Sequence, residues 1–558
     1  MKKFKKNWIT FSILVGIFIF ALLIRLINLS EFPVGFQIDE ASLGYNSYSL
    51  LMTGRSESGD FLPLYVNTFG DYNPIGYDYL AIPSIAIFGL NEFSTRLPAV
   101  IFGSLSILSM FYLSYVLFKN KKISMLSSLL MALSPWHIGL SRGSAETLVA
   151  LFFVITGFAF VFSFLNKYKK TNLVIGVIFL VISFLIYPAP RIFVPMLFIA
   201  VAAYYFKSWY LKKKYVVSLS LSLLIIIVSL TILIFTIPGG TARFKQTSIF
   251  NFPETRLLLE EQIREDGVSG TNNLITRAHH NKIINYSLTF VSNYMEYFNG
   301  SYIFLKGGQP LLFAIPGVGL VYLLELPFIL IGAYVLIKSR DKNSKIPILW
   351  LLIAPIVAAM TVDDSPNIRR SLLMVPAIEI IASVGIISFV SYFRNINFKL
   401  NNIHIKHIVI GIIVLCFIGN VMYFLHQYFV HAKHHRTWYR NNGFSELMKI
   451  VNENYENYDK IVTTKSGGGY PLFLFFSKYN PRVYQEEGSL KDADYKGFGK
   501  YIFVPSDCPS TDTRIKLSSK ARILYIDRGT CTEPSKESGK KYNNIYREDG
   551  SLGFRIIY

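Results

Sequence analysis

Charged side chains are scarce in this chain. Only 16% of its 558 residues are Asp, Glu, Lys or Arg, whereas 52% are hydrophobic. A soluble domain carries about 25% charged residues, so this chain has too few charges to cover its surface with water-facing groups. The composition therefore excludes an ordinary soluble enzyme and predicts that lipid covers much of the surface.

Cysteine is also rare, with three residues. Cys416 lies in an apolar stretch, where a buried thiol acting as a small hydrophobic side chain is expected. Cys508 and Cys531 lie in the polar C-terminal part, and such a pair can form a disulfide in an oxidising compartment. No cysteine spacing resembles a zinc site.

Apolar stretches long enough to cross a bilayer recur along residues 1–430, with short basic segments between them. The shortest have about 16 to 18 residues, close to the lower limit for crossing ~30 Å of hydrocarbon. The first is longer than the apolar core of a signal peptide, so we expect a retained anchor. The sequence predicts a polytopic α-helical membrane protein with about 11 transmembrane helices. Their expected positions are 8–27, 96–118, 123–140, 145–165, 171–187, 191–206, 215–236, 311–337, 346–362, 371–393 and 408–430.

The basic residues predict the orientation of these spans. With the N-terminus in the cytoplasm, the inside segments hold 21 Lys or Arg against one acid, Asp341. Lys and Arg gather in cytoplasmic loops, so this asymmetry favours that orientation. It explains the net charge of +21 without nucleic acid. We therefore expect a multi-pass protein of the cell membrane, with its C-terminal region outside the cytoplasm.

The chain divides into a membrane bundle and a polar tail. We expect the bundle over residues 1–430, with two long outside loops, 28–95 and 237–310, inserted in it. From His431 onward, "DKIVTTKS", "GKYIFVPSD" and "ARILYIDRG" read as strands between turns, and "GFSELMKIVNENYENY" predicts a helix. Residues 431–558 are therefore predicted to form a soluble extracytoplasmic α/β domain.

Two adjacent carboxylates, Asp39 and Glu40, follow the first span in "GFQIDEASLGYNSYSL". Ionisable groups beside lipid are costly and usually have a task. Acids can transfer protons, and arginines can hold a phosphate through paired donors. By the predicted orientation, the following acids and arginines lie on the same side of the membrane: Asp71, Glu146, Arg96, Arg142, Arg191, Arg369 and Arg370.

Each of these groups also has a structural interpretation. Arg96 and Arg191 could be anchors that extend to the membrane interface. The carboxylate of Glu146 could interact favourably with the N-terminus of the helix that it begins. The pair Asp39 and Glu40 could cap a short helix through "EASLGYNSYSLL".

The segment "DDSPNIRRSLLMVPAIE" offers a second pair of arginines, Arg369 and Arg370. Two guanidinium groups beside the N–H groups of a helix start would suit an anion such as a phosphate. The adjacent Asp363 and Asp364 could instead neutralise them, which would leave two interfacial anchors.

The order of these motifs resembles the membrane glycosyltransferases of the GT-C class, most closely the protein O-mannosyltransferases and the lipid A aminoarabinose transferases. The resemblance covers residues 1–150 well, the rest of the bundle loosely and the tail hardly at all. It is carried by the Asp39–Glu40 pair after the first span, Asp71 in "DYNPI", the "RLPA" that begins at Arg96, and Glu146 four residues after Arg142 in "SRGSAE".

The resemblance implies an enzyme that transfers a sugar from a polyprenyl-phosphate carrier to an acceptor outside the cytoplasm. In the family, the aspartate of the first-loop motif is the catalytic base or orients the acceptor, and this role falls to Asp39. Glu40 is then a supporting partner, and the relatives' other acids correspond to Asp71 and Glu146. Relatives often have a Lys that touches the donor phosphate where this chain has Tyr72 and Asn73, so the phosphate must be bound elsewhere. They also usually have Asp at the position of Glu146.

The chemistry agrees with this resemblance. A lipid-phosphate sugar already carries its leaving group, so we expect no nucleotide cofactor. The acceptor hydroxyl needs a base and the developing phosphate charge needs cations. A single displacement with one carboxylate as base would invert the anomeric centre. The candidate donor-phosphate ligands are Arg369, Arg370, Arg142, Arg191 and Arg96.

Some features stay open at this point. Asp39, Asp71 and Glu146 could share a divalent metal ion, although carboxylates alone do not specify one. Neither the sugar, hexose or pentose, nor the acceptor, whether protein, lipid or glycan, follows from the residues. An alternative function is a lipid or sugar transporter or flippase without transferase chemistry, but transporters place charges near the bilayer midplane in repeated halves. A receptor or scaffold would leave Asp39 without a role.

Overall fold

The computed structural model describes residues 2–68, 71–209, 213–235, 246–251, 253–394, 399–400, 403–466, 469–487, 497–515, 521–534 and 539–558. Contacts within the chain group it into two compact units. Unit 1 consists of Met1–Arg25, Ile101–Ser141 and Ala145–Phe424, and unit 2 of Leu26–Val100, Arg142–Ser144 and Leu425–Tyr558. The predicted outside loop 28–95 is thus counted with the tail.

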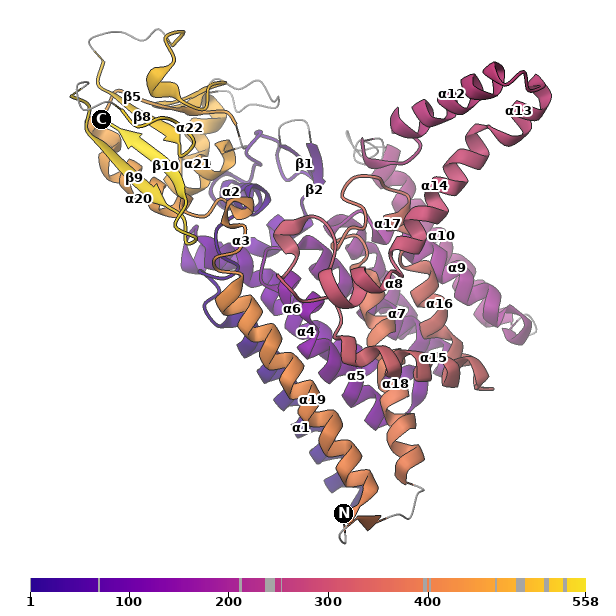
Figure 1. Ribbon diagram of the computed structural model, residues 1–558. Helices are drawn as coiled ribbons and strands as arrows, with labels where there is room; N and C mark the ends of the chain where they lie inside the picture. The colour runs from indigo at the N-terminus through magenta and orange to yellow at the C-terminus, as the bar shows by residue number, and fades with distance from the viewer. Residues whose placement is uncertain are drawn as a thin grey trace. The chain divides into compact units, whose positions relative to one another are not determined.

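Unit 1 is helical (Figure 1). Ile123, Leu336, Ile381 and Val384, from three of its helices, form one of its buried apolar clusters. The helices wholly or mostly in this unit are α1 (Lys2–Leu26), α4 (Glu92–Phe118), α5 (Lys121–Leu133), α6 (Pro135–Ser141), α7 (Glu146–Lys167), α8 (Lys170–Ile186), α9 (Pro190–Trp209), α10 (Lys213–Phe235), α12 (Pro253–Val268), α13 (Asn273–His279), α14 (Lys282–Glu296), α15 (Leu326–Lys338), α16 (Ile346–Ile353), α17 (Ile356–Ala359), α18 (Val375–Arg394) and α19 (Ile405–His426).

The helices confirm a multi-pass membrane protein. Within the described ranges, 7 helical segments are long and apolar enough to cross a membrane, or up to 8 if the bent pair α5–α6 is one span. Helix α8 and the segment Pro190–Tyr205 of α9 are apolar but have fewer than 18 residues. The predicted count of about 11 spans therefore stays a prediction.

Two expected spans are interrupted. The span 123–140 bends by 56° between α5 and α6, because Pro135 lacks the N–H that would continue the helix. In the span 311–337, only α15 is an α-helix, preceded by short 3₁₀ turns at Leu311–Phe313 and Leu323–Glu325. Pro316 and Gly317, which has a φ of 68°, break the helix between these turns.

Unit 2 combines the first long loop with a six-stranded sheet in the order β6-β7-β5-β8-β10-β9. Strand β5 runs parallel to β7 and β8, and the other pairs are antiparallel. The predicted C-terminal strands and helix are confirmed as β5, β7, β8 and α20; Figure 1 labels β5, β8 and α20. The elements are α2 (Ile38–Thr53), β1 (Tyr65–Thr68), β2 (Asp71–Pro74), α3 (Gly76–Phe88), α20 (Phe444–Asn454), β5 (Lys460–Thr464), α21 (Tyr470–Ser477), α22 (Pro481–Glu486), β6 (Gly497–Phe498), β7 (Tyr501–Val504), β8 (Ile523–Arg528), β9 (Tyr542–Tyr546) and β10 (Leu552–Ile557).

Aromatic packing joins the first loop to the tail within unit 2. The ring centroids of Phe36 and Phe475, in α21, lie 4.7 Å apart. Tyr45, buried in α2, donates a hydrogen bond to the carbonyl of Tyr479 at 3.0 Å. The predicted helix after the first span is confirmed as α2, and it is held from one side by the C-terminal part of the chain.

The cysteines behave differently from one another. Cys508 and Cys531 are joined as a disulfide, with their Cα atoms 5.7 Å apart. Cys508 follows β7 and Cys531 follows β8, so the disulfide joins the segments that leave these two strands. Cys416 is exposed on α19 instead of buried, because that helix packs little of its surface against the protein.

Candidate active site

The start of α2 places its two acids in opposite environments. Gln37 is the N-cap, and a capping box links its side chain and backbone with Glu40, the third residue of the helix. Asp39, the second residue, is exposed, whereas Glu40 is completely buried. The expected capping role is therefore filled by Glu40, and Asp39 is the acid that faces solvent.

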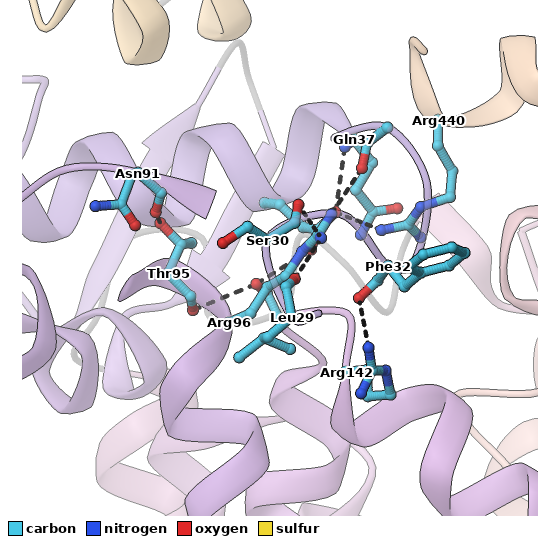
Figure 2. A network of polar contacts seen from close by, with 12 residues as sticks. Leu29, Ser30, Phe32, Gln37, Asn91, Thr95, Arg96, Arg142 and Arg440 are labelled. Atoms are coloured by element: carbon cyan, nitrogen blue, oxygen red, sulfur yellow. Dashed lines mark hydrogen bonds and ion pairs between the residues drawn. The ribbon is translucent and has the colours of Figure 1, made fainter. Parts of the chain in front are cut away.

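Glu40 lies between two arginines. The Nε of Arg96 donates to Oε1 of Glu40 at 2.9 Å, and Nη2 of Arg440 donates to Oε2 at 2.5 Å. Ser144 donates its hydroxyl to Oε1 at 3.3 Å. Figure 2 shows the guanidinium groups of Arg96 and Arg440 turned toward the same point. Both carboxylate oxygens of Glu40 are occupied by donors from the chain itself.

Arg96 also fixes the loop before α2. Its guanidinium donates to the carbonyls of Leu29 at 3.0 Å, Ser30 at 3.2 Å and Gly35 at 2.6 Å (Figure 2). Gly35 has a φ of 79°, and a Cβ there would collide with the Arg440 carbonyl, so this turn requires glycine. Because Arg96 is 0% exposed, its contacts identify it as a buried positioning residue.

Arg142 fixes the same loop from another direction. It is buried, and its Nη2 donates to the carbonyls of Ile27 at 2.6 Å and Phe32 at 3.2 Å. Its Nε donates to the hydroxyl of Tyr428 at 3.2 Å, and its guanidinium lies over the Tyr428 and Phe429 rings. The structure thus brings Arg96 and Arg142 around the loop that leads into α2.

The electrostatics of this group keep Glu40 ionised. Burial alone would raise the pKa of Glu40, but the charges of Arg96 and Arg440 and the hydrogen bonds outweigh it, so the pKa is lowered. The pKa of Arg440 is lowered mainly by burial, against the attraction of Glu40. A carboxylate held in this way is poorly suited to accept a proton from a substrate, since protonation would uncouple it from two buried cations.

Unit 1 contains a second acid–arginine pair, Glu146 and Arg369. Glu146 is the first residue of α7, and its carboxylate forms an ion pair with Arg369. The two side chains are 14% and 15% exposed. The guanidinium of Arg369 lies 5.9 Å from the Tyr187 ring centroid and 5.2 Å from that of Phe313. This pair is enclosed by rings but retains some accessible surface.

The other predicted arginines have contacts of their own. Arg370 donates to Oδ2 of Asp363 at 3.0 Å and to Oγ1 of Thr361 at 2.9 Å. Arg191 donates twice to the carbonyl of Phe184, at 3.1 and 2.8 Å. The neutralisation expected from the acidic turn thus applies to Arg370, while Arg369 is paired with Glu146.

Asp71 begins β2, but its side chain lies outside the described part of the structure. Among the described residues, no group of three His, Cys, Asp or Glu side chains could hold a metal ion. A metal shared by Asp39, Asp71 and Glu146 therefore stays a prediction.

A cavity of about 850 Å³ opens in unit 2 beside the loop before α2. Phe32, Gly35 and Phe36 form part of its wall, and Phe36 lies three residues before Asp39 in the chain. The charged and amide side chains that line it are Glu31, Glu92, Lys433, Asn441, Asn442, Glu446, Lys449, Arg547 and Glu548. The buried arginines described above hold the carbonyls of this wall.

Sequence reasoning missed several residues. Arg440 lies 400 residues after Glu40 in the chain, and no spacing or motif connects the two. Glu325 and Glu379, both buried in unit 1, were overlooked as well. The rarity of acids within apolar spans was a usable signal for Glu379.

Comparisons with known proteins agree with this architecture. Residues 72–234 match the family model described as dolichyl-phosphate-mannose-protein mannosyltransferase. No curated protein matches the chain in sequence. Among solved structures, ArnT from Cupriavidus metallidurans bound to undecaprenyl phosphate has a TM-score of 0.55 at 10% identity, covering 99% of this chain and 98% of that chain.

A second similar structure is the Archaeoglobus fulgidus oligosaccharyltransferase tethered with an acceptor peptide containing the NVT sequon. It has a TM-score of 0.53 at 15% identity, covering 86% of this chain. The match spans 64% of the oligosaccharyltransferase. Both solved proteins are GT-C glycosyltransferases, so the fold expected from the resemblance is confirmed: the chain has the GT-C fold, and its residues 72–234 match the mannosyltransferase family model.

Proposed function

We propose that this protein is an integral membrane glycosyltransferase that moves a sugar from a polyprenyl-phosphate donor to an acceptor outside the cytoplasm. The family match over residues 72–234 supports sugar transfer from a lipid phosphate. The similar ArnT structure holds undecaprenyl phosphate, and the similar oligosaccharyltransferase holds an acceptor peptide. Those ligands belong to the similar proteins and serve here as the basis for the donor and acceptor classes.

The observation that carries the proposal is the contrast between two adjacent acids. Glu40 is buried and occupied by two arginines, whereas Asp39 is exposed. Neighbouring carboxylates in different environments commonly divide their roles in this way. We therefore assign the general base to Asp39 and the positioning of α2 to Glu40.

The proposed step is a single displacement. The Asp39 carboxylate takes the proton of the acceptor hydroxyl while the oxygen of that hydroxyl bonds to the anomeric carbon. The bond between that carbon and the phosphate oxygen breaks, and the electron pair leaves with the polyprenyl phosphate. Attack from the side opposite the phosphate inverts the anomeric centre. Whether the sugar is a hexose or a pentose is not part of the proposal.

Cationic groups must stabilise the departing phosphate. Arg369 is the first candidate, because it keeps some exposure and its partner Glu146 could release it to a stronger anion. Arg370 and Arg191 are weaker candidates, since their donors are used by Asp363 and by a backbone carbonyl. Arg96 and Arg142 are assigned to positioning, because burial withholds them from a ligand.

We assign acceptor binding to the cavity of unit 2. Its wall leads directly into the start of α2, so an acceptor seated there would be near the residue proposed as base. Charge reversal at Glu446 and Lys449, on α20, is expected to raise the KM for acceptor and leave the KM for donor unchanged. Equal changes in the KM for acceptor and the KM for donor would show that the cavity does not bind the acceptor.

The membrane orientation also belongs to the proposal. A reporter fused after Tyr558 should behave as extracytoplasmic, and one placed within residues 207–214 as cytoplasmic. The reverse result would put Asp39 on the cytoplasmic side and overturn the assignment of an extracytoplasmic acceptor.

The decisive experiment follows sugar release from a polyprenyl-phosphate donor in proteoliposomes. Asp39→Asn should lower the rate by roughly 10²-fold or more while donor binding changes little, because the base acts on the acceptor. Glu40→Gln should act through stability instead. Chelation of divalent metal in the same assay tests a metal requirement.

The outcomes separate the alternatives. Normal transfer by Asp39→Asn, together with loss in Glu146→Gln or Asp71→Asn, would move the base to one of those residues. If all three variants stayed active, the transferase assignment would fail. Movement of labelled lipid across the membrane without sugar release would favour a flippase.

A further inference from the structure

A helical hairpin of unit 1 exposes apolar side chains. It consists of α12, α13 and α14, and Figure 1 shows it extending beyond the rest of the bundle, across the direction of α19. Two of its helices begin with an asparagine whose side chain accepts from the backbone, Asn272 before α13 and Asn281 before α14. The hairpin therefore has defined helix starts.

One face of α14 carries an apolar stripe. Ile284, Leu288, Val291 and Met295 are 36%, 62%, 53% and 60% exposed. Their spacing of four, three and four residues places them on one side of the helix. An exposed stripe of this kind is costly in water, so it is expected to have an occupant.

The rest of the helix is already used within unit 1. Asn285 donates to the side chain of Gln262 in α12 at 3.1 Å. Asn293 donates to the carbonyl of Ala359 at 3.3 Å. The hydroxyl of Tyr294 donates to the carbonyl of Leu352 at 2.8 Å. The stripe is thus directed away from the neighbours of α14, and the described residues of unit 1 leave it exposed.

The position of these contacts identifies the occupant. Leu352 and Ala359 belong to the candidate membrane span Lys342–Ala359, and Leu352 is itself 49% exposed. Exposed apolar side chains on a span contact lipid. The stripe therefore begins beside the lipid-facing surface of a span, at the end of that span, and continues outward along α14.

We propose that α14 lies in the membrane surface that surrounds the bundle, with its stripe in the acyl-chain boundary and its other faces against α12 and the span Lys342–Ala359. This is the usual placement of an amphipathic helix that does not cross the bilayer. Arg277 in α13 and Lys282 at the start of α14 lie at the end of α14 that is away from the span. Both are exposed and basic, which suits anionic headgroups. The partner is the phospholipid bilayer itself, and the proposal does not depend on the transferase chemistry.

The test uses the full chain in nanodiscs of phosphatidylcholine and phosphatidylglycerol. In a Cys416→Ser background, single cysteines at Leu288 and Val291 carry a fluorophore, and Lys282→Cys and Glu296→Cys are matched controls off the stripe. A nitroxide on the lipid acyl chain should quench the two stripe labels several-fold more than the controls. The stripe labels should lie about 5–10 Å into the headgroup and acyl boundary.

Equal, weak lipid quenching at all four positions would overturn the proposal. So would stripe labels that are shielded from lipid but quench one another between copies, since that result identifies a second chain as the occupant. A second measurement needs no substitution: a photoreactive acyl chain in the same nanodiscs should crosslink the unmodified protein within residues 284–295. Absence of crosslinks there, with crosslinks present on the span Lys342–Ala359, would equally reject the placement.

Discussion

The two units of the molecule use acid–arginine contacts in different ways. In unit 2, Glu40 is sealed between Arg96 and Arg440, with Glu40 and Arg96 fully buried. In unit 1, the pair of Glu146 and Arg369 remains partly exposed. A buried ion pair is committed to its partners, because removing one leaves the other uncompensated. A partly exposed pair can exchange a partner for a ligand at lower cost.

This difference separates residues that hold the site from residues available for its chemistry. The three buried arginines Arg96, Arg142 and Arg440 all contact the loop before α2 or the start of that helix. They hold the backbone that presents Asp39. Loss of a holding residue should therefore appear first in stability, and loss of a ligand-binding residue first in kinetics.

The largest expected effect is on stability in unit 2. Glu40→Ala leaves two buried guanidinium groups without their carboxylate and should cost about 3–5 kcal/mol. Thermal unfolding in detergent, with hydrogen exchange resolved by segment, measures this loss. Asp39→Ala is the matched control, and a change within about 0.5 kcal/mol is expected for this exposed neighbour. Equal destabilisation by the two variants would contradict the division between the acids.

The disulfide should give the next largest effect, also confined to unit 2. Cys508→Ala with Cys531→Ala should lower stability by about 2–4 kcal/mol, because the open chain gains conformational freedom when unfolded. Faster hydrogen exchange is expected in β7 and β8, with no change in α7 and α18. Free alkylation of both thiols in the native protein would show that the bond does not form.

A smaller, kinetic effect is expected in unit 1. Arg369→Ala should raise the KM for a polyprenyl-phosphate donor by about tenfold, the equivalent of one charge-assisted hydrogen bond of roughly 1.4 kcal/mol. Arg370→Ala is the internal comparison, because its side chain is already paired with Asp363. The melting temperature should stay near that of the parent protein. Unchanged kinetics in both variants would make them anchors and leave Arg191 as the remaining candidate for the donor phosphate.

The smallest effect is a response of unit 2 to acid. The pKa of Glu40 is lowered from its ordinary value of 4.5, so the folded state binds fewer protons than the unfolded state. Its contribution to stability is complete above 4.5 and is lost as the pH falls through the lowered value. Unfolding temperatures recorded across this range should fall less steeply in Glu40→Gln. An identical slope in both proteins would mean that other carboxylates control the acid response.

Much of the architecture could be predicted from local patterns. Apolar length indicated α7 and α18, and alternation indicated β5, β7 and β8, since these patterns depend only on the period of each element. The span expected at 311–337 was wrong over most of its length, because hydropathy does not register the effect of Pro316 and Gly317 on the backbone. The number of spans stays a prediction for the same reason.

The sequence by itself determined the membrane class, the secondary structure of the tail and the order of acids that resembles the GT-C enzymes. Only the tertiary structure decided which acid is buried. Asp39 and Glu40 are adjacent and chemically alike, and helix geometry turns them to different sides. Whether the inward side is apolar or occupied by cations depends on Arg96 and on Arg440, 400 residues farther along the chain. Such long-range pairing follows from folding and leaves no local pattern in the sequence, which is why Arg440 was found only in the structure.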